Sequence, residues 1–428
     1  MSRRVVITGM GVIAPLGIGI GPFWENLVAG RSAVGPITSF ETGNFHVKIA
    51  AEIKNFDPKA LIKQRKSLKV MARDIQLAVA CASLAMMDAG LEQPGKVDPR
   101  RIGTSLGAGL IPTEINELGV AIVNSRDGQQ QFDIRKFGKE GLEYLFPLWL
   151  LKYLPNMLAC HVSIIYDLQG PNNTITTACA ASSQAIGEGF RVIRRGDADM
   201  MVCGGSDSKI NPLSLLRYGL LKVLATRNDE PQKASRPFDR DRNGMVVGEG
   251  AGIMILEELD HARKRGAKIY AELAGFCSTC DGRMVGLACS DGSARDIAMK
   301  GAMEDAQVSP SEVDYICAAA IGTKAHDRAE AQAIRRAFGE VADRAPVTSL
   351  KSVMGHLGAG AGVVEAVAAA LATQHDVVPP TLNCENLDPE CALAVVREAQ
   401  QRPVRNVLCN VSSFAGQNAS LVIKKFVG

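Results

Sequence analysis

Short apolar segments rich in valine and isoleucine alternate along the chain with longer, alanine-rich segments of helical character. This alternation is typical of an α/β protein, in which helices cover the faces of a sheet. The predicted strands are the apolar segments at residues 4–11, 200–205, 252–259, 269–276, 313–320 and 419–426.

Two long passages follow one plan. Residues 178–207 (ACAASSQAIGEGFRVIRRGDADMMVCGGSD) begin with small residues, continue as a helix and end as a strand, and GEGAGIMILEE follows at 248–258. Residues 355–383 (GHLGAGAGVVEAVAAALATQHDVVPPTLN) also open a helix on small residues, and AGQNASLVIKK follows at 415–425. This similarity predicts an internal duplication, with an N-terminal half at 1–260 and a C-terminal half at 261–428. Coincidence between glycine- and alanine-rich segments is the alternative.

The segment near 110–160 interrupts the first half with a different composition. Polar NSRDGQQQF leads into the aromatic and leucine-rich LEYLFPLWLLKYLP. Such an apolar surface segment predicts an insertion that lies over the main body or at a subunit contact.

Composition excludes several functional classes. The 428 residues are 46% hydrophobic and carry a net charge of +3, which gives no support to a nucleic-acid partner. No apolar run reaches membrane-spanning length, and the opening MSRRVVITGMG is interpreted as a strand rather than a signal peptide. A cytoplasmic protein is expected.

The eleven cysteines are scattered, which predicts free thiols rather than a disulfide framework. Cys277 and Cys280 form one CxxC pair without a second pair at zinc-binding spacing. No metal site is therefore expected.

Cys179 lies in TTACAASS (176–183), among side chains no larger than threonine. The strand-like NTITTA precedes it and a helix-like segment follows, so the cysteine is predicted at a strand-to-helix junction. The positive end of the helix dipole would favour a thiolate there, and small neighbours would let a ligand approach. The alternative is a cysteine that only packs, since free cysteine is often buried.

Six motifs distinguish between these alternatives. They are VVITGMGVIAPLG (5–17), GPNNTITTACAAS (170–182), RPFDRDRNGMVVGEGAG (236–252), KSVMGHLGAGAG (351–362), PPTLN (379–383) and SSFAGQNASL (412–421). In this order and spacing the chain resembles the elongating β-ketoacyl-acyl-carrier-protein synthases over nearly its whole length. The resemblance implies a thiolase-like five-layer αβαβα sandwich of two duplicated α/β halves, usually a homodimer.

The resemblance also implies the reacting groups. Cys179 would accept an acyl chain from a carrier-protein phosphopantetheine thioester, and the acyl-enzyme would then condense with a malonyl-type thioester. His356 matches one of the family's two catalytic histidines, and Lys351 matches the lysine that sets the local field. Phe414 matches the gating phenylalanine, whose backbone N–H joins that of Cys179 in the oxyanion hole. Without the resemblance, His356 would be a structural histidine and Phe414 a core aromatic.

The same resemblance implies residues that support the active site and line the acyl pocket. Asp327 and Glu330 match a polar pair that supports the site, and Thr323 matches a threonine that contacts pantetheine. On spacing alone, Asp327 and Glu330 would form a solvated helix face. Leu110 corresponds to a position that lines the acyl pocket.

The acidic carrier protein is expected to dock on basic residues. KQRKSLK supplies Lys63, Arg65, Lys66 and Lys69, of which Arg65 and Lys66 lie within the segment QRK that matches a docking position. Lys222 matches a further basic position. The alternative for the run is a solvated helix face.

The family's other histidine is missing. It belongs to a motif N-A-H-G-T-S-T, but here the aligned stretch is CAAAIGTKAHDRAE (317–330) and places Ala319 at that position. Three outcomes are open: His326 replaces the imidazole, the synthase uses altered chemistry, or the chain only holds or transfers acyl groups beside an active partner. His326 could instead cap a helix or face water.

Other departures lie nearby. Ile321 and Gly286 stand where the family has threonines that contact pantetheine. In the gate loop Ser413 and Ala415 replace glycines, and only Gly416 persists. These replacements restrict the backbone angles of the loop.

The sequence predicts an acyltransferase of the 3-oxoacyl-carrier-protein synthase type, acting in fatty acid or polyketide-type biosynthesis with altered decarboxylation. The alternative is a non-condensing acyl-binding or chain-length-factor-like subunit. No cofactor is expected, because phosphopantetheine arrives on the acyl carrier protein. The expected assembly is a homodimer, with a heterodimer as the alternative. A thiolase is disfavoured because Cys409 lacks the C-x-G setting, and a nicotinamide dehydrogenase because GMGVIAP lacks a third phosphate-loop glycine.

Overall fold

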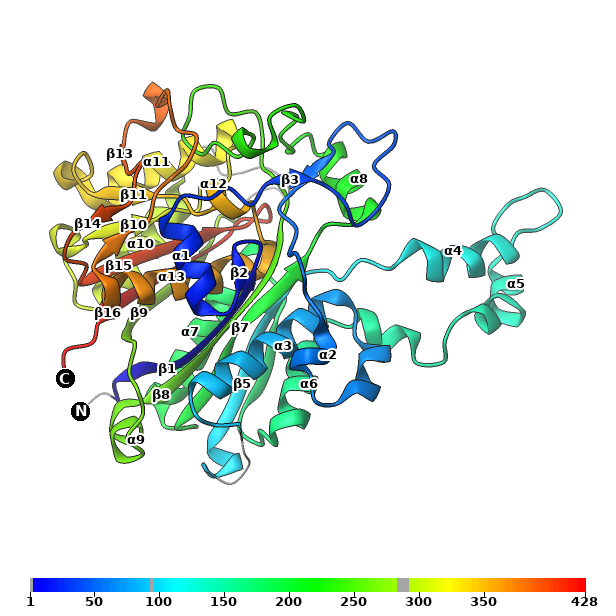
Figure 1. The fold of residues 1–428 in the computed structure, drawn as a ribbon, viewed down its shortest axis with the longest axis horizontal. Helices are drawn as coiled ribbons and strands as arrows, with labels where there is room; N and C mark the ends of the chain where they lie inside the picture. Colours follow the sequence, from blue (N-terminus) through cyan, green and yellow to red (C-terminus); the bar gives the residue numbers. More distant parts are fainter. Residues whose placement is uncertain (1–2, 93–95, 283–291) are drawn as a thin grey trace.

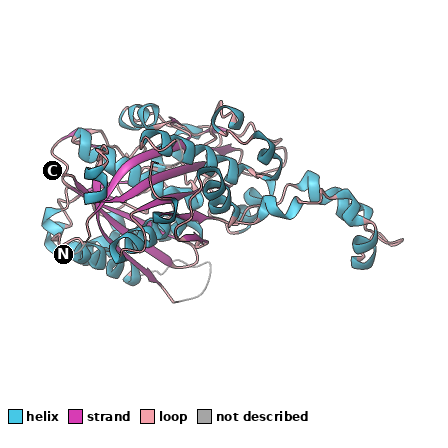
Figure 2. Ribbon diagram, turned by 90° about the horizontal axis from the view of Figure 1, so that it is seen from below, coloured by secondary structure: helices cyan, strands magenta, loops and turns pink. Residues whose placement is uncertain are grey.

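The computed structural model describes residues 3–92, 96–282 and 292–428. Its strands form a long mixed sheet in the order β13-β11-β10-β15-β16-β9-β1-β8-β7-β5-β6. Figure 1 shows this sheet running through the body, with helices on its faces. Both ends of the chain lie on the same side of the molecule, away from the arm near residues 110–160 (Figures 1 and 2).

The N-terminal half contributes five main strands. They are β1 (Val5–Ala14), β5 (Ile102–Ala108), β6 (Asn172–Ile175), β7 (Met200–Ser208) and β8 (Glu249–Glu258). β8 lies between β1 and β7 and pairs antiparallel with both, whereas β7–β5 and β5–β6 are parallel. The antiparallel strands β1, β8 and β7 lie toward the centre of the whole sheet, and the parallel strands β5 and β6 continue to its edge.

The C-terminal half repeats this pairing. Its strands are β9 (Ala271–Cys280), β10 (Tyr315–Cys317), β11 (Pro346–Thr348), β15 (Asn406–Ser412) and β16 (Gln417–Lys425). β16 pairs antiparallel with β9 and β15, and β15–β10 and β10–β11 are parallel. The two halves join where β1 and β9 pair antiparallel over three residues. The repeated order of strand directions supports the duplication seen in the sequence.

Helices form three layers around the two halves of the sheet. Helices α7 (Ala181–Arg195) and α13 (Ala361–His375) contact each other and pack on strands of both halves. Helices α3 (Arg73–Asp88) and α6 (Met157–Tyr166) cover the outer face of the first half, and α10 (Ser293–Asp305) and α11 (Lys324–Phe338) cover the second. Figure 2 shows helices on both sides of the strands. The fold is the thiolase-like α/β sandwich.

Helix α13 illustrates why these residues form the inner layer. Its residues from Ala361 to Thr373 are all buried, and most are alanine, valine or glycine. A helix that is apolar on every side is stable only when it is enclosed. The small side chains also let the strands approach closely from both sides.

Smaller elements complete the body. They are α1 (Ile20–Val28), α2 (Pro58–Leu61), η1 (Arg65–Val70), α8 (Pro212–Leu220), α9 (Leu259–Lys264), α12 (Lys351–Met354), β2 (Gly17–Ile18), β3 (Gly35–Pro36), β4 (Ile49–Ala50), β12 (Val377–Val378), β13 (Ala394–Val395) and β14 (Gln400–Gln401).

All six predicted strands are confirmed, with differences at their ends. The strand predicted at 313–320 is shorter in the structure, Tyr315–Cys317. Residues 318–323 leave the sheet because they form a loop that the buried Asp327 carboxylate holds through backbone N–H groups. A side-chain acceptor thus replaces strand hydrogen bonds at the end of β10.

The predicted insertion forms an arm that extends away from the body (Figure 1). It contains α4 (Ile115–Asn124), α5 (Ile134–Lys139), η3 (Gly141–Tyr144) and η4 (Trp149–Tyr153). This arm lies within the segment near 110–160 where the sequence predicts an insertion. The possibility that it covers the main body is wrong, because most of the arm projects into solvent.

Candidate active site

Cys179 lies in a single helical turn, η5 (Ala178–Ala180), between strand β6 and helix α7. The predicted strand-to-helix junction is therefore confirmed. Ala178 has a left-handed backbone with φ of 52°, which costs roughly 1–2 kcal/mol for a residue other than glycine. Cys179 is only 4% exposed. The fold therefore holds the thiol in a strained, enclosed turn, as is common at functional positions.

The small residues around Cys179 allow α7 to pack directly on its neighbours. A Cβ atom at Gly107 in β5 would lie 2.3 Å from the Ser182 backbone nitrogen. A Cβ atom at Gly362 in α13 would lie 2.1 Å from the Ser183 hydroxyl. Close packing thus requires glycine opposite these serines, in addition to any need for ligand access.

His356 is the nearest polar partner of the cysteine. Its Nε2 lies 3.0 Å from Cys179 Sγ. The histidine follows α12, and its backbone is fixed because its N–H donates to Val246 O at 2.8 Å and its carbonyl accepts from Gly248 N at 2.9 Å. The structure therefore brings together the predicted nucleophile and the predicted histidine from opposite halves of the chain.

Burial keeps this pair uncharged. It raises the pKa of the Cys179 thiol to about 12, with Asp207 acting in the same direction and Lys351 and Lys209 opposing it. It also lowers the pKa of His356 to about 3, with the Lys351 ammonium, and His326 once it is protonated in acid, acting in the same direction. At neutral pH the site holds a thiol beside a neutral imidazole. The expectation of a resting thiolate at the helix N-terminus is wrong because desolvation dominates.

Lys351 forms a buried ion pair with Glu365 of α13. Burial acts to lower the pKa of Lys351, but Glu365 together with Cys317 and Glu330 raises it, and the net shift of the pKa is upward. The ammonium charge opposes the rise in the pKa of Cys179 and adds to the fall in the pKa of His356. The role of Lys351 in setting the local field stays a prediction. Sequence reasoning missed Glu365, although it is the only acidic residue within the apolar α13.

Asp327 lies fully buried in the first turn of α11 and is not on a solvated face. Its carboxylate accepts N–H groups from Phe238 at 2.9 Å, Ile321 at 3.0 Å and Gly322 at 3.1 Å. It also pairs with Arg242 at 3.3 Å, and both side chains are 0% exposed. Arg242 was not predicted, although it lies in the motif at 236–252. Asp327 therefore ties the 318–323 loop to the first half of the chain.

Glu330 is also buried and supports the position that lacks the histidine. Its carboxylate accepts the Ala319 backbone N–H at 3.2 Å and the Asn410 side-chain amide at 3.3 Å. Arg295 lies 3.6 Å away. The solvated-face alternative is thus wrong for Glu330 too. Ala319 itself is 5% exposed and places only a methyl group in this loop.

His326 lies in the first turn of α11 with 7% of its surface exposed, so the possibility that it faces water is wrong. Its ring meets that of Phe414 edge to face, with centroids 4.8 Å apart. Phe414 in turn packs against Cys179, Ala180 and Val411. His326 therefore belongs to the same cluster of side chains as the cysteine.

The turn that carries Phe414 joins β15 to β16. Ser413 N donates to Gln417 O at 2.8 Å, and the Ser413 hydroxyl donates to the Gln417 side chain at 2.8 Å. Gly416 has φ of 85°, a left-handed conformation that explains why this glycine persists. Tyr218 of α8, which sequence reasoning missed, lies on the other side of Phe414 with centroids 6.4 Å apart.

The three positions that match pantetheine-contacting residues of the family lie in different surroundings. Thr323 is the N-cap of α11, and its hydroxyl accepts the His326 N–H at 3.4 Å. Ile321 is 3% exposed and packs in an apolar cluster with Leu224 and Val246. Gly286 lies outside the described residues. Contact with pantetheine stays a prediction.

Leu110 follows β5 at the base of the arm and is 67% exposed. Its carbonyl accepts the Lys209 ammonium at 2.6 Å, which fixes the backbone. Within a single chain its side chain is therefore not enclosed in a pocket, and its contact with an acyl chain stays a prediction.

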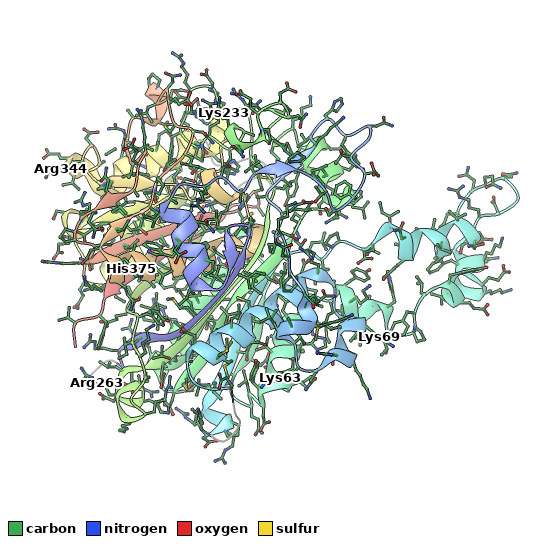
Figure 3. All side chains as sticks on the ribbon, in the orientation of Figure 1. Lys63, Lys69, Lys233, Arg263, Arg344 and His375 are labelled. Carbon is green, nitrogen blue, oxygen red and sulfur yellow. The ribbon has the colours of Figure 1, made fainter. Side chains whose placement is uncertain are left out.

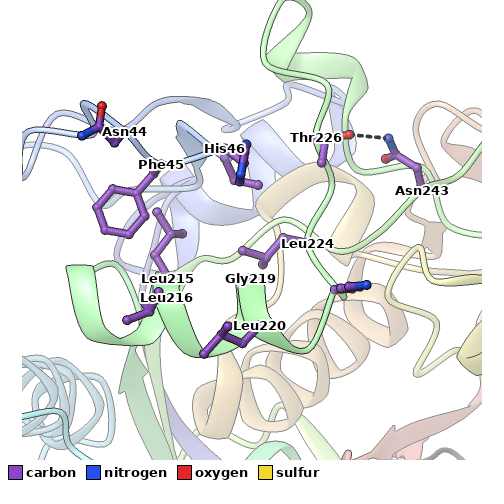
Figure 4. A pocket seen from close by; sticks show the side chains of 12 residues that line it. Asn44, Phe45, His46, Leu215, Leu216, Gly219, Leu220, Leu224, Thr226 and Asn243 are labelled. Carbon is purple, nitrogen blue, oxygen red and sulfur yellow. Dashed lines mark hydrogen bonds between the residues drawn. The ribbon is translucent and has the colours of Figure 1, made fainter.

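The predicted docking residues are exposed. Lys63, Arg65, Lys66 and Lys69 surround the short helix η1, and Figure 3 shows Lys63 and Lys69 on the underside of the body in that view. Lys222 follows α8 and lines a cavity of about 600 Å³. Figure 4 shows Phe45, Leu216 and Leu220 around this cavity. An apolar hollow with an exposed ammonium suits a partner that carries both apolar and acidic groups.

The ten described cysteines are all free, as predicted. Within the described residues, no group of three or more His, Cys, Asp and Glu side chains is arranged to hold a metal ion. Each helix in the described part of the chain is too short or too polar to traverse a bilayer.

Comparison with known proteins agrees with the geometry. Residues 2–262 match the family "Beta-ketoacyl synthase, N-terminal domain" and residues 270–385 match "Beta-ketoacyl synthase, C-terminal domain". The 3-oxoacyl-[acyl-carrier-protein] synthase 2 of Coxiella burnetii is 39% identical over 427 residues, which cover 99% of each chain. A β-ketoacyl synthase from Burkholderia phymatum is 33% identical, with a TM-score of 0.89 over 99% of this chain and 100% of that one. A chain from the structure of a type II polyketide acyl-carrier protein bound to its ketosynthase is 32% identical, with a TM-score of 0.84 over the whole of both chains.

Proposed function

Because the chain belongs to the β-ketoacyl synthase family, we propose that it transfers an acyl group from an acyl-carrier protein to Cys179 and condenses it with a malonyl-type thioester. The observation that carries this proposal is the 3.0 Å contact between Cys179 Sγ and His356 Nε2 beside the buried Lys351 charge. A thiol, a neutral base and a fixed cation are the groups that covalent acyl transfer requires.

The acylation step begins with a neutral thiol. As Cys179 Sγ attacks the thioester carbonyl carbon, His356 Nε2 accepts the thiol proton, and Lys351 stabilises the charge that develops on sulfur. The backbone N–H groups of Cys179 and Phe414 are the proposed donors to the tetrahedral oxyanion. When the intermediate collapses, the pantetheine sulfur leaves with the proton from His356. The acyl group is then bonded to Cys179.

The condensation step needs a different arrangement of charge. The malonyl-type thioester loses carbon dioxide, and the resulting enolate carbon attacks the acyl carbonyl on Cys179. The Cys179 thiolate leaves and regains a proton from water, and the β-ketoacyl product remains on the carrier. The enolate oxygen needs N–H donors. His356 Nε2 can provide one once the thiol is acylated and the neutral ring has exchanged its single proton from Nδ1 to Nε2 through water.

Ala319 separates the two candidate activities. A methyl group cannot donate a hydrogen bond to the enolate, and removal of one such donor typically slows a reaction roughly 100- to 1,000-fold. This residue is the specific observation that favours the second candidate, a subunit that receives acyl groups without condensing them. Cys179, His356 and Lys351 serve acylation in either case.

Exposed basic residues indicate where the carrier protein delivers its substrate. We propose that the acidic carrier protein docks on Arg65, Lys66 and Lys222, and that the pantetheine passes Tyr218 and Phe414 to reach Cys179. The chain would use no cofactor of its own and would act in the cytoplasm.

The arm suggests how the chain assembles. Its exposed apolar side chains include Ile115, Val120, Val123, Phe132, Ile134, Leu142, Phe146, Leu148 and Leu150. So much apolar surface on one projecting segment is typical of a protein contact. We propose that a second copy of this chain covers it in a homodimer.

Intact-protein mass spectrometry tests the proposed function. The protein and its Cys179→Ala variant are incubated with acyl-carrier proteins of several chain lengths and then with malonyl-carrier protein. The proposal requires a Cys179-dependent acyl adduct that malonyl-carrier protein discharges as a β-ketoacyl product. An adduct that persists would establish the acyl-holding alternative, and absence of any adduct would exclude both.

A further inference from the structure

The imidazole of His326 has one ring nitrogen with no visible role in the fold. Its Nε2 is buried and, among the described residues, has no hydrogen-bond partner. The whole side chain is 7% exposed, so bulk water does not satisfy this atom. Buried polar atoms without partners are uncommon in folded proteins, and a catalytic role or a bound molecule is among the explanations for them.

The other ring nitrogen of His326 indicates which tautomer is present. Nδ1 lies 3.2 Å from Thr323 Oγ1, and the same oxygen accepts the His326 backbone N–H at 3.4 Å. When the hydroxyl oxygen acts as the helix cap, its single hydrogen can be donated to Nδ1. Nδ1 is then an acceptor, and the ring proton is on Nε2.

Burial also keeps the imidazole neutral. It lowers the pKa of His326 to about 3, and the Arg295 guanidinium acts in the same direction. A neutral ring with Nδ1 engaged presents Nε2–H as a donor that has no partner in the resting protein. Such a group costs no reorganisation when a negative charge forms beside it.

The His326 ring lies next to the side-chain cluster that contains Cys179. The His326 ring touches Phe414, which itself packs on Cys179. The adjacent loop places only the methyl group of Ala319 at the position of the missing histidine, whereas the first turn of α11 brings a side-chain N–H next to this cluster.

We infer that His326 Nε2–H is a second hydrogen-bond donor to the enolate oxygen, acting together with His356 in the condensation step. This inference rests on the proposed function and deepens it. The donor comes from the helix that follows the loop rather than from the loop itself. Decarboxylating condensation is therefore retained although position 319 is an alanine.

To test this inference, acylation and condensation are measured separately in the variants His326→Ala and His326→Gln. Acylation of Cys179 is followed by intact mass after mixing with acyl-carrier protein. Condensation is then measured in a single turnover of the acylated protein with malonyl-carrier protein, from released carbon dioxide and β-ketoacyl product. His161→Gln is a matched control, because His161 is also 7% exposed with an unpartnered Nε2 but lies on α6, in the outer layer.

The inference predicts a selective loss. His326→Ala should acylate within about twofold of wild type but condense roughly 100- to 1,000-fold more slowly. His326→Gln should condense roughly tenfold or more faster than His326→Ala, because its amide can donate an N–H. His161→Gln should not change one of the two rates selectively.

Three other results would overturn the inference. Wild-type condensation by His326→Ala would refute the role of His326 and leave the proposed function intact. Equal loss of both half-reactions with a lowered melting temperature would identify a structural residue. Failure of the wild type to discharge its acyl group would remove the proposed condensation and this inference together.

Discussion

Lys351 and Glu365 form an ion pair in which the side chains are 2% and 0% exposed. They come from two helices, α12 and α13, and their contact places a fixed positive charge near both Cys179 and His356. Removal of one member of such a pair leaves an uncompensated buried charge, whereas removal of both does not.

Lys351→Met should therefore destabilise the protein by about 3–5 kcal/mol, and Lys351→Met combined with Glu365→Met should recover most of that loss. Urea unfolding of the two variants and of wild type measures this. Both variants should acylate more slowly, because the Cys179 thiolate loses the charge that favours it. Equal stability of the single and double variants would show that the pair is not coupled.

The two buried histidines should make the free energy of unfolding decrease as the pH is lowered. His326 and His356 have a pKa of about 3 in the folded chain, below the value of about 6.5 for an unfolded histidine. The unfolded chain then binds more protons, so their contribution is complete above pH 6.5 and is lost as the pH falls toward 3. The expected slope is about 1.4 kcal/mol per pH unit for each histidine.

Urea unfolding at pH 7, 6 and 5 tests this dependence. His326→Gln should reduce the slope by the share of one histidine, and the same slope in both proteins would argue against a buried neutral His326.

Gly362→Ala should disturb the position of Cys179. The added Cβ would lie 2.1 Å from the Ser183 hydroxyl on α7, in a fully packed layer. We expect a loss of about 1–3 kcal/mol in unfolding free energy and slower acylation. Gly128→Ala on the arm is the control, because no atom lies within 4 Å of its Cβ position. Equal melting temperatures and acylation rates for the two variants would contradict the packing argument.

Charge reversal at Arg65 and Lys66 should weaken binding of the acyl-carrier protein without affecting substrates that have no carrier. We expect Arg65→Glu with Lys66→Glu to raise KM for acyl-carrier protein by roughly tenfold, with the effect reduced at high salt. Acylation by a small acyl thioester without a carrier should not change. Lys264→Glu, an exposed lysine on α9, serves as the control. Equal effects on both donors would locate the defect in the site rather than in docking.

Polar substitution on the arm should change the oligomeric state. Leu148 and Leu150 are 51% and 58% exposed in one chain. If a second copy covers them, Leu148→Ser with Leu150→Ser should shift the mass measured by light scattering toward the monomer. Met87→Ser on α3, at 54% exposure, should leave the mass unchanged. A wild-type protein that is already monomeric would contradict the homodimer.

The sequence by itself determined the strands, the junction that holds Cys179 and the family, because periodic patterns and ordered motifs are properties of the linear chain. It also identified the missing histidine at Ala319. The tertiary structure decided what depends on distant segments. Cys179 and His356 are 177 positions apart, yet their atoms lie 3.0 Å from each other.

Burial is the physical reason for the remaining differences. The spacing of Asp327, Glu330 and His326 fits a solvated helix face, but the packing of α11 against the body encloses all three side chains. Desolvation then decides their charge states, and it reverses the expected thiolate at Cys179. Glu365 acquires its role only because α13 is enclosed next to Lys351. A side chain's chemistry at this site thus depends on which neighbours exclude water from it.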